Sequence, residues 1–284
     1  MLNFDDQVKN LLIAAFKEDV GIGDHSTLSC IDPHAMGQAV LLIKQEGILA
    51  GVGIAHEIFK FKEPSSVFIA FKKDGEEMQV GEKAFEIKAH VHTILQCERL
   101  LLNSMQRMSG IATLTHRYVE KIKGYNTRIL DTRKTTPNFR LLEKEAVRIG
   151  GGLNHRFGLY DMIMLKDNHI DYCGGIEKAI EKASAYVQAK NLNLKIEVET
   201  RDLDEVKRVV AVGRVNRIML DNFLPTQVAE ALHFINGRYE TEASGGINLE
   251  NIIEYAKTGV DFVSIGGLIH QAKSLDLSLK AVIL

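Results

Sequence analysis

The spacing of hydrophobic and polar positions changes part-way along the chain. Up to about Met105, an amphipathic helix and several strand-like apolar runs are separated by glycines, which predicts a mixed α+β domain. A long helical stretch follows, and we expect it to be interrupted near Ser109 and Gly110. Beyond it, short apolar runs alternate with helical periods, a pattern that requires parallel strand pairing through crossover helices.

Six apolar runs carry the strand signal in this second part. They are TRILDT, DMIMLK, KIEVET, RIMLDN, YETEAS and DFVSIG. Such a βα alternation fits either an open doubly wound sheet or a closed barrel. An open sheet gathers its functional residues at one switch point, whereas a barrel collects them at the carboxyl ends of all its strands. Because polar residues or glycines follow nearly every run, we favour a barrel, shortened or incomplete because only six strands are found.

Composition narrows the classes of partner and location. The chain has 284 residues, of which 45% are hydrophobic and 25% charged, and its formal net charge is -2. This balance argues against nucleic acid or an anionic membrane as a partner. No apolar run approaches the roughly 18 residues of a membrane span, and the first residues are acidic where a signal peptide would be basic. The three cysteines show no CxxC pairing, so we expect a cytoplasmic protein without disulfides.

Cationic side chains gather at the predicted strand ends. The group comprises Arg133, Lys134, His155, Arg156 and Lys166, with Arg99 from the long helical stretch. These charges would repel one another strongly unless a multiply anionic ligand lies among them. A single strand-end cation is usually a solvated charge, but the run of Arg133 and Lys134 among threonines indicates a binding site.

Carboxylates and glycines complete the candidate site. Glu199 and Asp221 offer the hard oxygen ligands that Mg²⁺ prefers beside substrate phosphates. Glu197 faces the same side of its strand as Glu199, and one of the two could simply balance a nearby lysine. The last two strands end in Ser244, Gly245, Gly246 and Gly266, whose backbone N–H groups suit a phosphate, although glycine pairs are also typical of plain turns. Together these residues indicate a phosphorylated sugar, a divalent cation and a second, carboxylated substrate.

Several segments resemble one known family. They are EDVGIGDHST, CERLLLNSMQRMSGIAT, DTRKTTPNFRLLEKEAVRIGGGLNHRFGLYDMIMLKDNH, EVET, IMLDNF, EASGGIN and VSIGGLIH. In this order they look like the motifs of the quinolinate phosphoribosyltransferases, the carboxylating nicotinate-nucleotide pyrophosphorylases. The resemblance spans most of the chain.

The resemblance implies a fold and an assembly. It implies an N-terminal α/β sandwich followed by an incomplete, about six-stranded TIM-like α/β barrel, in agreement with the strand pattern. We predict the sandwich over residues 1–110, the barrel over 111–270 and, over 271–284, a C-terminal helix that packs back on the N-terminal domain. Arg99 matches an arginine that reaches the neighbouring subunit's site in the family, which implies a homodimer with shared active sites.

The resemblance also implies a reaction, in which quinolinate and phosphoribosyl pyrophosphate give nicotinate mononucleotide, pyrophosphate and carbon dioxide for NAD biosynthesis. Arg133, His155, Arg156 and Lys166 match the pocket for the two quinolinate carboxylates, and Lys134 lies beside them. Glu199 and Asp221 match the acidic pair that serves the ribose hydroxyls and magnesium. The 5′-phosphate cradle matches Ser244, Gly245, Gly246 and Gly266, with His270 near that phosphate. By this reading the catalytic group is Lys134, Lys166, Glu199 and Asp221.

Three alternatives stay open at this stage. A paralogous branch associated with molybdenum transport shares the fold and much of the site, but the full TRKTTP, NHR and KDNH set favours the quinolinate enzyme. A Schiff-base barrel aldolase could use Lys166, although it would not need the surrounding cations. A non-catalytic sensor of phosphate ligands would leave Glu199 and Asp221 unexplained.

Overall fold

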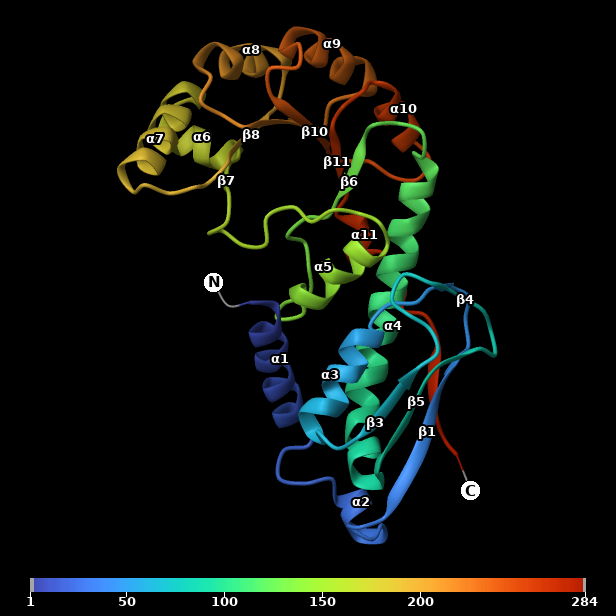
Figure 1. The fold of residues 1–284 in the computed structure, drawn as a ribbon. Helices are drawn as coiled ribbons and strands as arrows, with labels where there is room; N and C mark the ends of the chain where they lie inside the picture. The colour runs from blue at the N-terminus through green and yellow to red at the C-terminus, as the bar shows by residue number, and fades with distance from the viewer. Residues whose placement is uncertain (1–2, 283–284) are drawn as a thin grey trace. The chain divides into compact units, whose positions relative to one another are not determined.

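The computed structural model describes residues 3–282, which form two compact units (Figure 1). The N-terminal unit contains the chain up to His116, the segment Thr135–Gly151 and the chain from Leu268 onwards. The barrel unit contains Arg117–Lys134 and Gly152–Gly267. This division differs from the continuous boundaries that we predicted, because a helix from the middle of the chain and the C-terminal segment both belong to the N-terminal unit.

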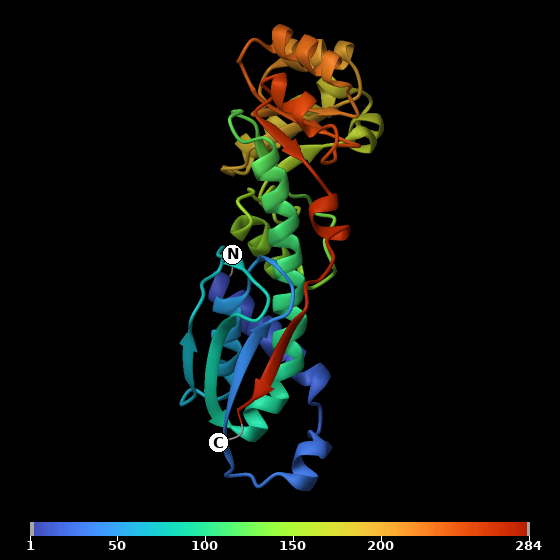
Figure 2. The same ribbon diagram turned by 90° about the vertical axis from the view of Figure 1, so that its right-hand side faces the viewer.

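The N-terminal unit is built on an antiparallel sheet with the strand order β12-β1-β5-β3 (Figure 2). These strands are β1 (Met36–Ile43), β3 (Val67–Ala70), β5 (Lys83–His90) and β12 (Leu277–Ala281), and β2 (Gly47–Ile48) and β4 (Glu77–Met78) form a separate short pair. The predicted C-terminal helix is therefore wrong. Leu277 and Leu279 are buried while Ser278 and Lys280 are more exposed, and this alternation is the period of a strand.

The N-terminal unit also contains helices. They are α1 (Phe4–Asp19), α2 (His25–Cys30), α3 (Val52–Lys62), α5 (Arg140–Ile149) and the 31-residue α4 (Val91–Lys121), which continues into the barrel unit. The interruption predicted near Gly110 does not occur. Ser109 donates its hydroxyl to the Ala50 carbonyl at 3.2 Å, and Gly110 is needed because a side chain there would collide with the Lys273 carbonyl. Among the described helices, none is long and apolar enough to cross a membrane.

The barrel unit confirms the six predicted strands. All six are parallel, in the order β6-β11-β10-β9-β8-β7. They are β6 (Arg128–Leu130), β7 (Ile163–Leu165), β8 (Ile196–Thr200), β9 (Arg217–Asp221), β10 (Glu240–Ser244) and β11 (Phe262–Ser264). Since β6 and β7 are the two edges of this sheet, the barrel is incomplete.

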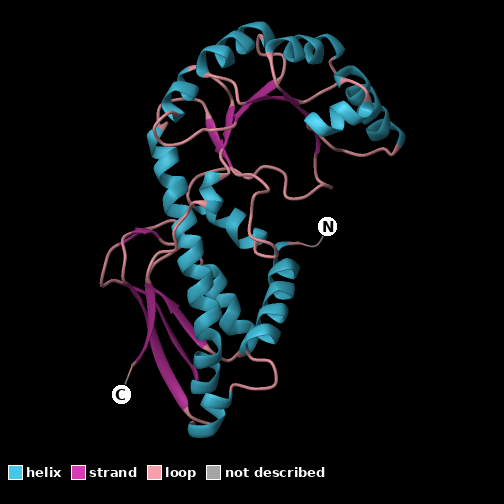
Figure 3. Ribbon diagram, turned by 180° about the vertical axis from the view of Figure 1, so that it is seen from behind, coloured by secondary structure: helices cyan, strands magenta, loops and turns pink. Residues whose placement is uncertain are grey.

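The crossover helices of the barrel unit lie on the outer side of its curved sheet (Figures 1 and 3). They are α6 (Asp167–Cys173), α7 (Ile176–Ala189), α8 (Leu203–Val212), α9 (Pro225–Ile235) and α10 (Ile252–Lys257), and the short α11 (Gly267–His270) leads out of the unit. Alternate strand residues therefore face these helices, and the others face the inside of the curve. The inward positions near the carboxyl ends of the strands hold the candidate site.

Candidate active site

Three charged side chains lie at the carboxyl ends of β7, β8 and β9, and the charge of Lys134, from the loop after β6, acts on one of them. Lys166, directly after β7, places its Nζ 2.7 Å from Oε2 of Glu199 on β8. Asp221 ends β9, and its pKa is raised above the ordinary range, first by burial and then by the negative charge of Glu199, while Lys166 and Lys134 act in the opposite direction. The four residues predicted as the catalytic group thus influence one another through space.

Two guanidinium groups lie close together beside this cluster. The pKa of Arg156 is lowered, first by burial and then by the charge of Arg133. Arg156 donates from Nη1 to the Met162 carbonyl at 3.2 Å. The buried Nε of Arg133 finds no acceptor among residues 3–282. Such cations with an unused donor form a site that an anion would stabilise.

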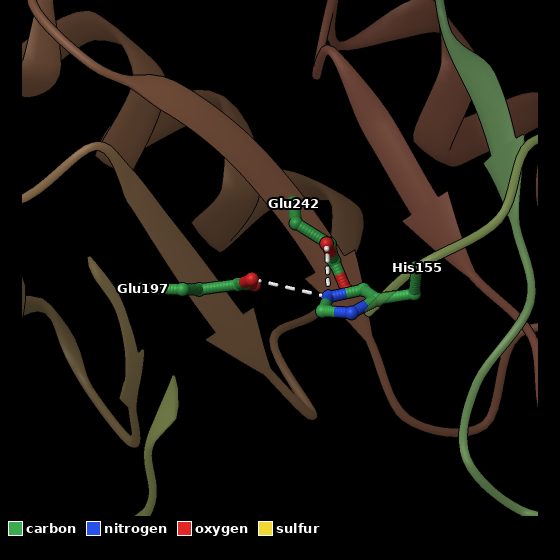
Figure 4. A group of neighbouring side chains, drawn as sticks. All are labelled: His155, Glu197 and Glu242. Atoms are coloured by element: carbon green, nitrogen blue, oxygen red, sulfur yellow. Dashed lines mark ion pairs between the residues drawn. The ribbon is translucent and has the colours of Figure 1, made fainter. Parts of the chain in front are cut away.

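His155 is buried in the barrel unit, where its ring faces Glu197 and Glu242 (Figure 4). Its side chain is 4% exposed, and its Nε2 lies 3.1 Å from Glu197 and 3.3 Å from Glu242. The Arg156 backbone N–H donates to its Nδ1 at 2.7 Å, and its own backbone N–H donates to Asp131 at 2.8 Å. Both ring nitrogens are therefore engaged within the protein.

A buried ion network surrounds the His155 ring. Arg217 Nη1 lies 3.0 Å from Glu242 and 3.9 Å from Glu197, and its guanidinium stacks 4.1 Å from the centre of the Phe262 ring. Burial, followed by the charge of Glu242, raises the pKa of Glu197 to about 7. Burial alone would lower the pKa of His155, but its two carboxylate partners outweigh burial and raise it to about 9. Because Nδ1 accepts the Arg156 N–H, the proton that these pKa values describe is shared between Nε2 and the two carboxylates, and the group keeps it near neutral pH.

Sequence reasoning missed most of this network. Of the two glutamates on β8, Glu199 is the one that pairs with a lysine, and Glu197 pairs with His155 and Arg217. Glu242 and Arg217 were not singled out, although Glu242 stands two positions before Ser244 and so faces the same side of β10. The alternation of Glu240 and Glu242 along β10 was the sequence signal that could have placed a carboxylate on this face.

Glycine shapes the loop after β10. Gly245 has φ 92°, and a side chain there would collide with the Asn222 carboxamide. Asn222 donates its backbone N–H to the Ser244 carbonyl and its Nδ2 to Asp221, each at 2.7 Å. Gly245 therefore allows the β10 loop to lie against the residue that orients Asp221. Gly246, with φ 65°, continues the same turn.

The remaining predicted residues lie elsewhere in the chain. Gly266 lies between β11 and α11 and is half-buried. Arg99, in α4, and His270, at the end of α11, are exposed and belong to the N-terminal unit. The roles assigned to these three residues stay predictions.

Comparison with known proteins decides the family. The pattern described as "Quinolinate phosphoribosyl transferase, C-terminal domain" matches residues 111–280, and the corresponding N-terminal domain matches residues 24–109. The chain belongs to the quinolinate phosphoribosyltransferase family. Among its relatives in this family is the chloroplastic nicotinate-nucleotide pyrophosphorylase [carboxylating] of Arabidopsis thaliana, which is 43% identical over 288 residues covering 96% of this chain and 82% of the relative.

Bacterial quinolinate phosphoribosyltransferases are similarly close. The probable nicotinate-nucleotide pyrophosphorylase [carboxylating] of Bacillus subtilis is 43% identical over 273 residues, covering 96% of this chain and 93% of the relative. The crystal structure of NadC from Streptococcus pyogenes superposes with a TM-score of 0.91 at 41% identity, over 100% of this chain and 99% of that one. The sandwich and incomplete barrel expected from the sequence are therefore the fold of a solved relative.

Proposed function

We propose that this chain catalyses decarboxylating phosphoribosyl transfer, converting quinolinate and phosphoribosyl pyrophosphate to nicotinate mononucleotide, pyrophosphate and carbon dioxide in NAD biosynthesis. The observation that carries the proposal is the pair of neighbouring guanidiniums, Arg133 and Arg156, with the unused Nε donor of Arg133. A dicarboxylate supplies the two negative charges that this pair lacks. Homologues over the whole chain carry the same activity in their names.

Arg133, Arg156 and Lys166 would bind the two quinolinate carboxylates. Lys166 has 44% of its side chain exposed and forms an ion pair with Glu199. That pair would have to break before Lys166 could attack a carbonyl, which argues against a Schiff-base aldolase. His155 would not contact quinolinate itself, since both its ring nitrogens already have partners. It would instead orient Arg156 by accepting that residue's backbone N–H.

Departure of pyrophosphate leaves positive charge on the ribose ring. Glu199 and Asp221 would stabilise that charge, while Lys134 would stabilise the negative leaving group. The same two carboxylates fit Mg²⁺, because burial and then the charge of Glu199 raise the pKa of Asp221, and a bound cation would relieve this repulsion. When bound there, Mg²⁺ would supply further charge neutralisation for the pyrophosphate.

Decarboxylation needs orientation more than a further catalytic group. Once the pyridine nitrogen carries the ribose, the cationic ring stabilises the electron pair left on its carbon when the neighbouring carboxylate departs as carbon dioxide, and that carbon then takes up a proton from water to give nicotinate mononucleotide. Arg133 and Arg156 would hold the ring so that this bond is aligned for cleavage. The 5′-phosphate would lie against Ser244, Gly245, Gly246 and Gly266, with His270 near it.

The assembly and location complete the proposal. We expect a homodimer in which Arg99 reaches the partner's site, with small-molecule substrates and neither nucleic acid nor membrane as partner. A cytoplasmic location is supported by the three cysteines, all of which are free thiols in the structure.

A substrate comparison tests the function. The purified protein is incubated with phosphoribosyl pyrophosphate and Mg²⁺, and nucleotide formation is followed with quinolinate and, separately, with nicotinate. Turnover with quinolinate alone, abolished by EDTA, is the expected result. The Arg133→Ala variant should bind quinolinate roughly 10- to 100-fold more weakly, as expected for the loss of a charged hydrogen bond. Turnover with nicotinate, or unchanged affinity in the variant, would contradict the proposed pocket.

A further inference from the structure

One buried ion pair in the N-terminal unit joins segments that come from three distant parts of the sequence. Glu143, in the first turn of α5, is fully buried, and its Oε1 accepts a hydrogen bond from Nε of Arg107 in α4 at 3.0 Å and lies 3.0 Å from Nη2 of the same ion pair. A buried carboxylate is retained only with good partners, because its desolvation costs several kcal/mol. We therefore expect the Glu143–Arg107 pair to hold these segments of the N-terminal unit in place.

The first arm of the pair reaches the loop that follows β6. Glu143 accepts the backbone N–H of Thr136 at 2.7 Å and the Thr136 hydroxyl at 2.9 Å. Thr136 is two residues beyond Lys134 and three beyond Arg133. The carboxylate thus fixes the chain immediately after the two cations that are proposed to meet the substrates.

The second arm reaches the turn that carries His270. Arg107 donates from Nη2 to the Ile269 carbonyl at 2.8 Å and from Nη1 to the Ala272 carbonyl at 2.7 Å. These carbonyls stand on either side of His270, so the guanidinium fork holds both ends of the turn. Gly110, one helical turn along α4, lets the backbone at Lys273 approach the helix closely.

Neither Glu143 nor Arg107 has a place in the reaction proposed above, yet together they bond to both segments that do. We infer that Glu143 and Arg107 are positioning residues that hold the Arg133–Lys134 loop and the His270 turn in their working geometry. This inference rests on the proposed function and adds to it residues that touch neither substrate.

The Glu143→Gln variant is the first test. The amide keeps the volume and one acceptor for Thr136, but its NH₂ group cannot accept from Arg107. We expect kcat/KM to fall roughly a hundredfold, the cost of a misplacement of about 1 Å in a reacting group. Activity is measured per folded molecule, well below the melting temperature of each variant, so that lost stability alone does not lower it. Glu145→Gln, which breaks only the exposed pair with Arg148 on the same helix, is the matched control and should keep wild-type kcat/KM.

Two milder variants separate the arms. Thr136→Val removes only the hydroxyl donor and should raise KM for quinolinate, whereas Thr136→Ser keeps the hydroxyl and should restore it. Arg107→Lys keeps the charge but cannot bond to both carbonyls, and it should raise KM for phosphoribosyl pyrophosphate. These variants keep the inference testable even if Glu143→Gln fails to fold.

The outcomes for the inference and for the function are distinct. Wild-type protein that does not turn over quinolinate overturns the proposed function before any variant is compared. If the wild type is active but Glu143→Gln has unchanged kcat/KM per folded molecule, or Thr136→Val and Arg107→Lys raise the same KM, the positioning role is overturned alone. An ion pair with a merely structural role would not make Thr136→Val raise KM for quinolinate and Arg107→Lys raise KM for phosphoribosyl pyrophosphate.

Discussion

Lys166 Nζ and Glu199 Oε2 lie 2.7 Å apart, so the cation at the end of β7 and the carboxylate of β8 neutralise each other. Each of these groups is also proposed to meet a ligand of opposite charge. Binding of quinolinate must therefore compete with Glu199 for Lys166, and binding of a divalent cation must compete with Lys166 for Glu199. The Lys166–Glu199 pair therefore couples binding of quinolinate to binding of the divalent cation.

This competition predicts an unusual phenotype for Glu199→Gln. Removing the carboxylate frees Lys166, so quinolinate measured alone by calorimetry should bind about fivefold more tightly, the equivalent of about 1 kcal/mol for a partly exposed ion pair. Turnover should nevertheless fall, because the charge near the ribose is lost. Lys166→Met should weaken quinolinate binding instead. Weaker binding by Glu199→Gln would show that the two ligands do not compete within this pair.

The buried network predicts the pH dependence of stability. The carboxylates raise the pKa of His155 from 6.5 to about 9, so the folded state holds a proton that the unfolded state releases earlier. The contribution of His155 is fully present below pH 6.5, and the free energy of unfolding should fall by up to about 3 kcal/mol as pH rises through about 9. Urea denaturation at a series of pH values measures this slope, and His155→Gln should flatten it. An equal slope in the variant would assign the effect to other groups.

Removing one carboxylate from the same network should lower the free energy of unfolding more than raising the pH does. Glu242→Leu removes the closest buried carboxylate of Arg217 and leaves His155 with Glu197 alone, and such a loss typically destabilises a protein by about 3–5 kcal/mol. Glu177→Leu, which breaks only the exposed pair with Arg208, is the matched control and should change stability little. Urea denaturation at neutral pH compares the two variants, and equal effects would contradict a structural role for the network.

Gly245 predicts how sensitive the proposed phosphate-binding loop is to substitution. An alanine there combines a positive φ with a collision against Asn222, and it should both destabilise the protein and weaken binding of phosphoribosyl pyrophosphate. Gly259→Ala is the control, because Gly259 has φ 84° but open space around it, so its cost should be limited to roughly 1–2 kcal/mol of backbone strain. Calorimetric affinities of the two variants distinguish collision from strain. Unaltered affinity in Gly245→Ala would remove this loop from the substrate site.

The proposed sharing of active sites predicts complementation between inactive variants. Arg99→Ala and Arg133→Ala should each be inactive alone as homodimers. If Arg99 works in the partner's site, an equal mixture that exchanges subunits should recover about a quarter of wild-type activity, because half of the dimers are mixed and each has one intact site. No recovery after demonstrated subunit exchange would place Arg99 in the site of its own subunit.

The sequence predicted those features that repeat or cluster along the chain. The six βα runs repeat with a clear period, and Arg133, Lys134 and Lys166 stand directly after strands, so both could be recognised. The ion network could not be recognised in the same way, because a buried glutamate such as Glu242 looks like a solvated one until its strand neighbours are known. Likewise, the pairing of Glu143 with Arg107 joins positions far apart in the sequence.

The C-terminal strand was missed for a related reason. Residues 277–281 alternate as a strand should, but the run is short and its partner, β1, lies more than 230 residues earlier. A helix was predicted where only this distant partner could fix the structure. The secondary structure of such a short segment depends less on the local propensity of its residues than on the sheet edge with which it pairs.

The position of β12 beside β1 has a consequence for synthesis. A chain leaving the ribosome has made β1, β3 and β5 long before residues 277–281 exist, and until then β1 presents an unpaired edge. The barrel strands β7 to β11, whose neighbours lie closer in sequence, can pair first. Residues 277–281 therefore complete the first sheet late, so a premature stop before residue 277 would leave an aggregation-prone product.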